Sequence, residues 1–98
     1  MSSMTQITSH AEVVTEDPGR YAKQLASHLG RKLAAEEDGD STVLRFDGGW
    51  CRLTPAAGAL LLHAEADSAE VLHRVEQVVG SHLERFGTRS ELAVNWVR

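Results

Sequence analysis

Residues 38–66 read DGDSTVLRFDGGWCRLTPAAGALLLHAEA, and this stretch decides the fold. Turn-forming residues interrupt it at 38–41, 47–50 and 54–59, and apolar and polar residues alternate between these points. Alternation with a period of two is typical of strands that bury one face. The stretch therefore predicts an antiparallel meander of four strands, the first of which precedes residue 38.

The turns also predict how the strands pair. We assign two-residue loops to Gly39-Asp40 and Gly48-Gly49 and a four-residue loop to 55–58, which places Leu53 opposite Leu60. The three registers agree on one apolar face, and a slip of one residue would turn a whole strand over, so the agreement supports the hairpins. The predicted inner face consists of Leu33, Ala35, Leu44, Phe46, Cys51, Leu53, Leu60, Leu62 and Ala64.

A strand and a helix are expected before the meander. Alternating residues over 7–14 predict the strand. Asp17 as the N-cap and Pro18 at the first helical position predict a helix over about 18–29. Gly30 follows where a helix commonly ends in the left-handed conformation.

A second helix and a last strand are expected after the meander. Asp67 caps the helix, Glu70 completes a capping box, and an apolar stripe at helical spacing continues to Gly87. Residues 91–97 alternate again and predict a strand. The order strand, helix, four strands, helix, strand predicts an α+β two-layer sandwich, in which an antiparallel sheet of five to six strands carries two helices on one face.

Length and composition limit the classes of function. The 98 residues suffice for one core, so we expect a flexible tail over 1–6 and a single α+β domain over 7–98. A formal net charge of −4 without clustered cations argues against nucleic-acid binding. The single cysteine, Cys51, rules out an intrachain disulfide. No leader pattern or long apolar run occurs, which predicts a soluble cytoplasmic protein without a membrane span.

Two histidines occur in matching contexts. Residues 24–31 (QLASHLGR) and 78–85 (VVGSHLER) each carry a Ser-His-Leu triplet near the end of an expected helix. Helical spacing directs both His28 and His82 inward or along a seam. Gly80 in the middle of a helix costs about 1 kcal/mol relative to alanine, which suggests that another backbone approaches closely there. If the two helices are neighbours, the histidines meet.

Two interpretations of this histidine pair remain open. His28 and His82 form a site, completed by Tyr21, Gln24 or Cys51, that binds a transition metal or transfers a proton. Alternatively, each imidazole bonds a backbone carbonyl and fills space in the core. The second interpretation is favoured because metal sites normally have three or four protein ligands.

The outer face of the predicted sheet carries basic and aromatic residues. The registers set Arg45 opposite Arg52 and Trp50 opposite His63, and a like-charge pair is unfavourable without compensation. One interpretation is a solvated charge cluster in which Glu36 reaches Arg45. The other is a surface for a partner or an anionic aromatic ligand, because Trp and Arg are frequent in binding hot spots. The predicted partner interface comprises Arg45, Trp50, Arg52, Leu61 and His63.

Three stretches carry a resemblance to a known family. RYAKQLASHLGRK (20–32), GGWCRLT (48–54) and HLERFGTRSELAVNWVR (82–98) resemble the bacterial domain-of-unknown-function family 2218, and the similarity begins at about residue 7. The resemblance implies no activity or catalytic residue. Similar domains occur alone, or near or joined to siderophore-interacting flavin reductases. The family pattern includes the residues matched here by Tyr21, Gln24, His28 and His82.

Three functions follow from these observations. The favoured one is a non-catalytic accessory or binding protein in iron and siderophore handling, whose partner is a ferric chelate or a siderophore-interacting reductase. No cofactor is expected, and a transition metal of unknown identity remains the one open possibility. The alternative is a structural interaction module that dimerises or docks a partner through the outer sheet face. An enzyme with His28 or His82 as general base comes last, because no nucleophile, acid–base pair or oxyanion site can be assembled.

Overall fold

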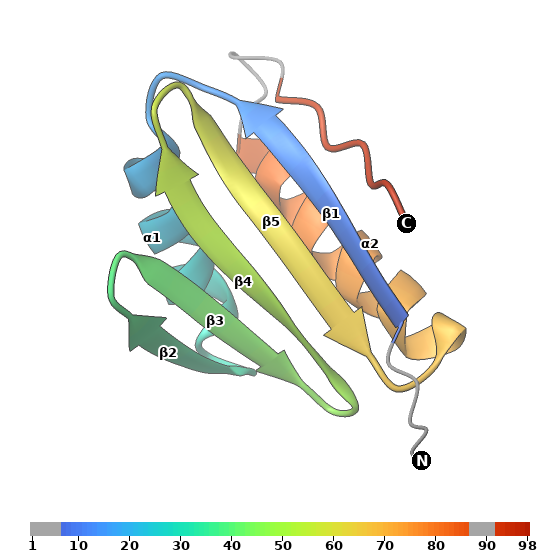
Figure 1. The fold of residues 1–98 in the computed structure, drawn as a ribbon. Helices are drawn as coiled ribbons and strands as arrows, with labels where there is room; N and C mark the ends of the chain where they lie inside the picture. Colours follow the sequence, from blue (N-terminus) through green and yellow to red (C-terminus); the bar gives the residue numbers. More distant parts are fainter. Residues whose placement is uncertain (1–6, 87–91) are drawn as a thin grey trace.

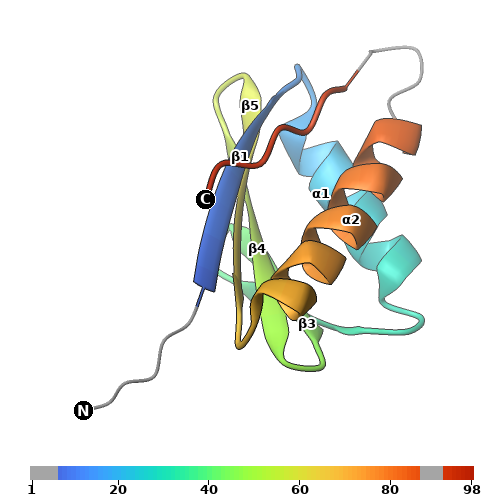
Figure 2. The same ribbon diagram turned by 90° about the vertical axis from the view of Figure 1, so that its right-hand side faces the viewer.

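The computed structural model describes residues 7–86 and 92–98, so the expected tail over 1–6 and the expected helix end at Gly87 lie outside the described residues. The elements are β1 (Ile7–Val14), α1 (Pro18–Leu29), β2 (Ala34–Asp38), β3 (Ser41–Phe46), β4 (Gly49–Ala56), β5 (Ala59–Ala66) and α2 (Ala69–Phe86). The strands form one antiparallel sheet in the order β1-β5-β4-β3-β2, and both helices cover the same face of it (Figure 1, Figure 2). The predicted α+β sandwich is confirmed. Within the described ranges, neither helix has the length and apolar character needed to cross a membrane.

The hairpins form as predicted, but two of their loops are shorter or displaced. The turn between β3 and β4 is Asp47-Gly48, and the turn between β4 and β5 is Ala57-Gly58. The second residue of each turn is a glycine with positive φ, a conformation that side chains with a Cβ rarely adopt. Leu53 consequently lies opposite Leu62 and not opposite Leu60. Both errors are shifts of two residues, which change the partners and keep every side chain on its predicted face.

The inner face of the sheet and the two helices enclose the core. The predicted inner-face residues that are at most 1% exposed are Leu44, Cys51, Leu53, Leu60, Leu62 and Ala64. Leu33 and Phe46 are partly buried against them. Ala35 pairs with Leu44 as predicted, but it is exposed, because β2 is the edge strand of the sheet and all five of its residues are exposed.

The helices span the predicted residues, whereas their caps differ. Asp17 makes no side-chain cap hydrogen bond. Gly30 has φ −63° and is right-handed rather than left-handed, because the chain continues in a turn after α1. The N-cap of α2 is Ser68, whose Oγ accepts a hydrogen bond from the Val71 amide at 3.2 Å, and not Asp67. The neighbouring residue therefore supplies the cap that the sequence pattern assigned to Asp67.

Residues 92–98 follow the edge of β1 in place of the predicted last strand (Figure 1). They pair with β1 at one bridge, where the His10 amide donates to Val97 O at 2.9 Å and the Val97 amide donates to His10 O at 2.8 Å. The Val94 amide donates instead to the carboxylate of Glu84 at 3.1 Å. Because this amide bonds a side chain of α2, the sheet ladder does not extend along residues 92–98. Residue 91, the first of the predicted strand, lies outside the described residues.

Two contacts with α2 hold this segment. A methyl group added at Gly80 would lie 3.2 Å from Trp96 Nε1, so the glycine makes room for the C-terminal segment rather than for α1. Arg98 donates two hydrogen bonds to Glu76, from Nε at 3.1 Å and from Nη2 at 2.9 Å. Burial alone would raise the pKa of Glu76, but the hydrogen bonds and charge of Arg98, with contributions from Ser9 and His73, outweigh it and lower the pKa.

Candidate functional site

The two histidines come together in the seam between α1 and α2. His28 lies in the last turn of α1, and its ring centroid is 5.0 Å from that of His82. The Phe86 ring stands almost perpendicular to the His28 ring, with the centroids 5.8 Å apart. His28 is exposed and His82 is half-buried. The repeated Ser-His-Leu triplets therefore place two imidazoles next to each other at the protein surface.

A groove of about 330 Å³ opens beside this pair. Its lining residues are His28, Leu29, Lys32 and Leu33 from α1 and the turn after it, Phe46 from β3, and Arg74, Val78 and His82 from α2. The floor is apolar. The polar groups at the groove are two imidazoles, one ammonium and one guanidinium, and no acidic residue lines it. We call this hollow the histidine groove.

The helical spacing of α2 explains one wall of the histidine groove. Arg74, Val78 and His82 follow one another at intervals of four residues, so their side chains lie on one face of the helix. The opposite wall comes from His28 in the last turn of α1 and from Lys32 in the turn that follows this helix. Sequence reasoning did not single out Lys32 or Arg74. The spacing of Arg74, Val78 and His82 is visible in the sequence, but it indicates a groove only once the position of α1 is known.

The two cations of the histidine groove have no ion-pair partner in the described part of the chain. The ion pairs found there are Glu36–Arg45, Asp38–Arg52, Glu65–His63 and Glu76–Arg98. Lys32 and Arg74 take part in none of them. Because both side chains are charged at neutral pH, the groove is electropositive although the chain as a whole is acidic.

The hydrogen bond made by His82 shows which of its two ring nitrogens is left to interact with a ligand. Nδ1 lies 2.7 Å from Val78 O, a carbonyl that can only accept, so Nδ1 carries the proton and donates. In the neutral ring, Nε2 then has a free lone pair, as in histidines that bind metals or accept protons. Among the described residues, no group of three His, Cys, Asp or Glu side chains is placed to hold a metal ion. At most two imidazoles are therefore available here, and a bound metal would need further ligands from a chelator.

The other residues predicted to complete the pair lie elsewhere. Tyr21 and Gln24 belong to earlier turns of α1 and do not line the histidine groove; Gln24 is exposed and Tyr21 packs partly buried against the core. Cys51 is fully buried on the inner sheet face. Burial raises the pKa of its thiol to about 12, so Cys51 stays protonated and is not a ligand or nucleophile.

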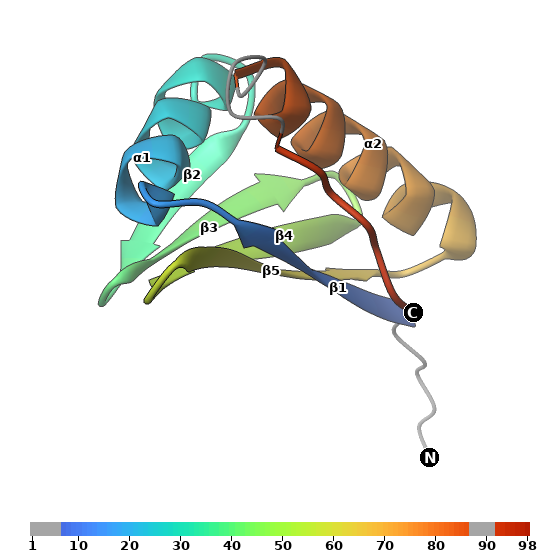
Figure 3. The same ribbon diagram turned by 90° about the horizontal axis from the view of Figure 1, so that it is seen from above.

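The predicted partner interface lies on the other face of the sheet, which neither helix covers (Figure 3). Each predicted pairing was wrong by two residues, because the turn between β3 and β4 is displaced and the loop between β4 and β5 is shorter than predicted. Arg45 lies opposite Trp50, and Arg52 lies opposite His63. Trp50 and His63 remain neighbours on this face, with ring centroids 5.5 Å apart. We call the residues of this surface, with Leu61, the outer sheet face.

Carboxylates neutralise the basic groups of the outer sheet face. Arg45 Nε donates to Glu36 at 3.0 Å, as the charge-cluster interpretation predicted. Arg52 Nη1 donates to Asp38 at 2.7 Å. His63 Nε2 donates to the carboxylate of Glu65 at 3.0 Å. The charges on this face are therefore balanced within the chain.

Comparison with known proteins gives a family and a fold. A family model described as an uncharacterized protein conserved in bacteria (DUF2218) matches residues 10–97. The NMR structure of PA4090 from Pseudomonas aeruginosa is similar, with a TM-score of 0.77 and 26% sequence identity over 92% of this chain and 94% of that chain. No curated protein matches the sequence. Neither description states an activity.

Proposed function

Since the chain belongs to the DUF2218 family of uncharacterized bacterial proteins, we propose from the geometry of its histidine groove that it is a non-catalytic accessory domain that binds a ferric chelate. In this role it acts in iron or siderophore handling in the cytoplasm, where it receives the chelate from, or presents it to, a reductase. The observation that carries the proposal is the contact between His28 and His82 beside an electropositive groove.

Three properties of the groove suit such a ligand. Two imidazoles can complete the coordination of an iron whose remaining ligands come from the chelator. The charges of Lys32 and Arg74 complement an anionic chelate. The apolar floor, which includes Phe46, can accept the aromatic or alkyl part of a chelator.

The geometry supports binding more than catalysis. An exposed imidazole such as that of His28 can act as a general base. Catalysis also needs a partner group that orients the base or attacks the substrate. In the part of the chain that the structure describes, neither histidine bonds a carboxylate, and the only thiol is buried in the core.

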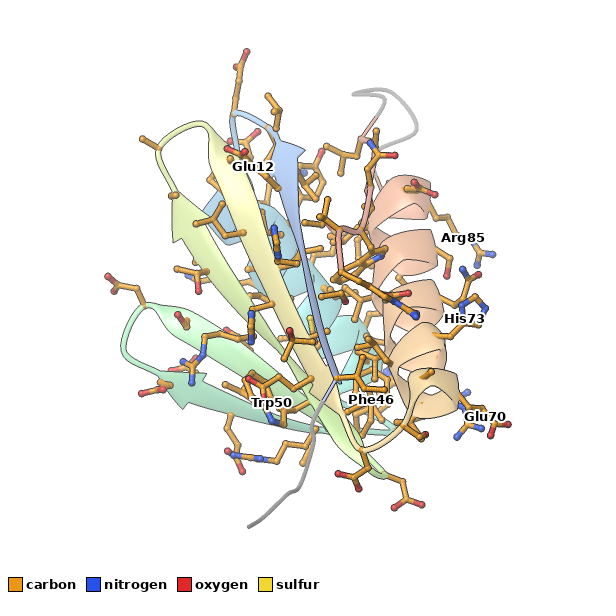
Figure 4. All side chains as sticks on the ribbon, turned by 45° about the vertical axis from the view of Figure 1, so that its right-hand side comes forward. Glu12, Phe46, Trp50, Glu70, His73 and Arg85 are labelled. Carbon is orange, nitrogen blue, oxygen red and sulfur yellow. The ribbon has the colours of Figure 1, made fainter. Side chains whose placement is uncertain are left out.

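The test is titration of the untagged protein with the ferric complex of 2,3-dihydroxybenzoate, followed by calorimetry. We expect one binding site per chain, with affinity at least about tenfold weaker in the His28→Ala/His82→Ala variant. His73→Ala is the matched control, since His73 is an exposed histidine on α2 that projects away from the sheet (Figure 4). Elemental mass spectrometry of the purified protein shows whether a metal is also retained without the chelator. No binding at high micromolar concentration, or equal losses in both variants, would contradict the proposal.

A second candidate function is self-association through the outer sheet face. The observation that favours it is the 39% exposure of Leu61 beside the Trp50–His63 pair. These residues lie on the sheet face that neither helix covers (Figure 3). Aromatic residues at the centre of a flat face are frequent in homodimer interfaces. Sedimentation equilibrium should then show a dimer that Trp50→Ala dissociates. A monomer at every concentration, unchanged by this substitution, would eliminate the homodimer.

A further inference from the structure

The histidine groove brings two cations without a carboxylate partner to one hollow. Other described cations, such as Arg31 and Arg85, also bond no carboxylate, but they do not line the groove. The arginines of the outer sheet face and Arg98 each bond a carboxylate of the chain. Lys32 and Arg74 line a common hollow and bond none. Two like charges near one hollow repel each other, and a bound anion between them removes this repulsion.

The shape and lining of the groove restrict the anion. A fully hydrated ion such as phosphate gains little from an apolar floor, whereas the aliphatic side chains and Phe46 favour a ligand with an apolar body. A volume of about 330 Å³ suits a small molecule of one or two rings and is at the lower end for ligand pockets. The neighbouring imidazoles and the guanidinium of Arg74 stack well on aromatic planes.

We infer that the histidine groove binds an aromatic monocarboxylate in the absence of any metal, with the carboxylate held by Lys32 and Arg74 and the ring lying over Leu29, Leu33 and Phe46. This inference rests on the groove being the ligand site, as proposed above, and goes further by assigning the recognition to the cations and the apolar floor. A guanidinium can bind a carboxylate through two parallel hydrogen bonds, which orients the ring as well as holding the charge. The histidines form the wall beside the ring.

The test uses 2-naphthoate as the probe, in buffer with EDTA, and the ¹⁵N-labelled full chain. Chemical shifts should change for amides around the groove, with a Kd between about 10 µM and 1 mM, as expected for a small ligand in an open groove. The Lys32→Gln/Arg74→Gln variant should bind at least about tenfold more weakly. Both side chains are exposed, so the variant should fold. If it does not fold, the single variant Lys32→Gln is used and should lose at least about threefold.

Two matched controls separate this site from general attraction between charges. Arg31→Gln/Arg85→Gln removes the same charge from exposed positions on the same two parts of the fold, and neither residue lines the groove. Arg85 projects away from the sheet (Figure 4). It should bind 2-naphthoate within about twofold of the wild type. The uncharged analogue 2-naphthalenemethanol should bind at least about tenfold more weakly than 2-naphthoate. Equal binding of the two compounds, equal losses in the two double variants, or shifts confined to another surface would overturn the inference.

The results also separate this inference from the proposed function. Binding of metal-free 2-naphthoate without binding of the ferric chelate supports the inference and contradicts the iron-handling proposal. Binding of the ferric chelate without binding of 2-naphthoate does the reverse. Binding of neither contradicts both.

Discussion

The histidine groove and the outer sheet face have similar side chains but differ in whether their charges are balanced. Each combines histidine, aromatic and basic residues, and each contains an imidazole close to another ring. On the outer sheet face every arginine is matched by a carboxylate, whereas Lys32 and Arg74 of the groove are not. Composition alone therefore does not distinguish a binding site from a charge cluster that is already balanced. The difference lies in whether the chain satisfies its own charges.

The largest expected effect is on the free energy of unfolding, and it comes from comparing the two faces of β5. Leu62 of β5 is 1% exposed on the inner face, and Leu61 beside it is 39% exposed on the outer sheet face. Leu62→Ala should lower the free energy of unfolding by about 2–5 kcal/mol, because it leaves a cavity in the core. Leu61→Ala should lower it by less than about 1 kcal/mol. Urea denaturation measures both.

A loss at Leu61 as large as that at Leu62 would show that the outer sheet face is buried in solution, for instance in a dimer. In that case the stability of Leu61→Ala would also depend on protein concentration. The pair of variants thus tests the second candidate function with the same measurement.

The same two leucines show what the sequence could and could not predict. Alternation identified the inner face, because a side chain reaches the core or the solvent according to its parity in the strand. It could not fix the register, because the glycine-rich turns allowed loops two residues apart and both choices bury the same face. The turn from Asp47 to Gly48 was decided by the glycine that adopts positive φ.

The site was less predictable than the fold, for a related reason. The repeated local contexts of the two histidines predict a pair, yet the contact between them depends on how α1 and α2 pack. Lys32 and Arg74 look like ordinary exposed cations in the sequence. Their lack of partners is a property of the assembled surface, since a carboxylate from any element could have reached them. The same holds for the C-terminal segment, whose Val94 amide bonds Glu84 of another element.

The next prediction concerns a substitution that gives the histidine groove a carboxylate, so that its charges are balanced as they are on the outer sheet face. Val78 lies four residues from both Arg74 and His82 and lines the groove, so Val78→Glu supplies a carboxylate to both. The new carboxylate should neutralise the site and weaken binding of 2-naphthoate at least about tenfold. Calorimetry in buffer with EDTA measures the affinity.

Val78→Gln is the matched control, because it has the same shape without the charge. It should retain binding within about threefold of the wild type. If glutamine and glutamate weaken binding equally, the apolar wall and not the charge of the groove controls the affinity, and the electrostatic contrast between the two regions does not explain binding.

A smaller effect is expected at the Glu76–Arg98 pair, which is balanced like the outer sheet face but has a buried carboxylate. Glu76 is 7% exposed, and Arg98 lowers its pKa. A lowered pKa means that the folded state favours the ionised carboxylate, so its contribution is present above the ordinary value of 4.5 and is lost as the pH falls below it. Glu76→Gln should lower the free energy of unfolding by about 1 kcal/mol at pH 7.

Urea denaturation between pH 7 and pH 3 checks this dependence. The difference between the wild type and Glu76→Gln should shrink as the pH falls through the pKa of the folded state. Glu12→Gln is the control, since Glu12 is an exposed carboxylate on β1, outside both helices (Figure 4). A difference that stays constant with pH would mean that Glu76 acts through packing and not through its charge.

The smallest effect is expected where the comparison began, at the ion pairs of the outer sheet face. The side chains of Arg45 and Glu36 are 53% and 54% exposed, so water screens their attraction and the pair adds little to stability. Glu36→Gln should change the free energy of unfolding by less than about 0.5 kcal/mol. It should nevertheless leave Arg45 without a carboxylate, as Lys32 and Arg74 are in the histidine groove. If an unmatched cation is sufficient for anion binding, 2-naphthoate should then shift the amides of β3 and β4. If the apolar floor is also required, as the structure of the groove implies, these amides should not shift, and NMR titration of Glu36→Gln decides between the two.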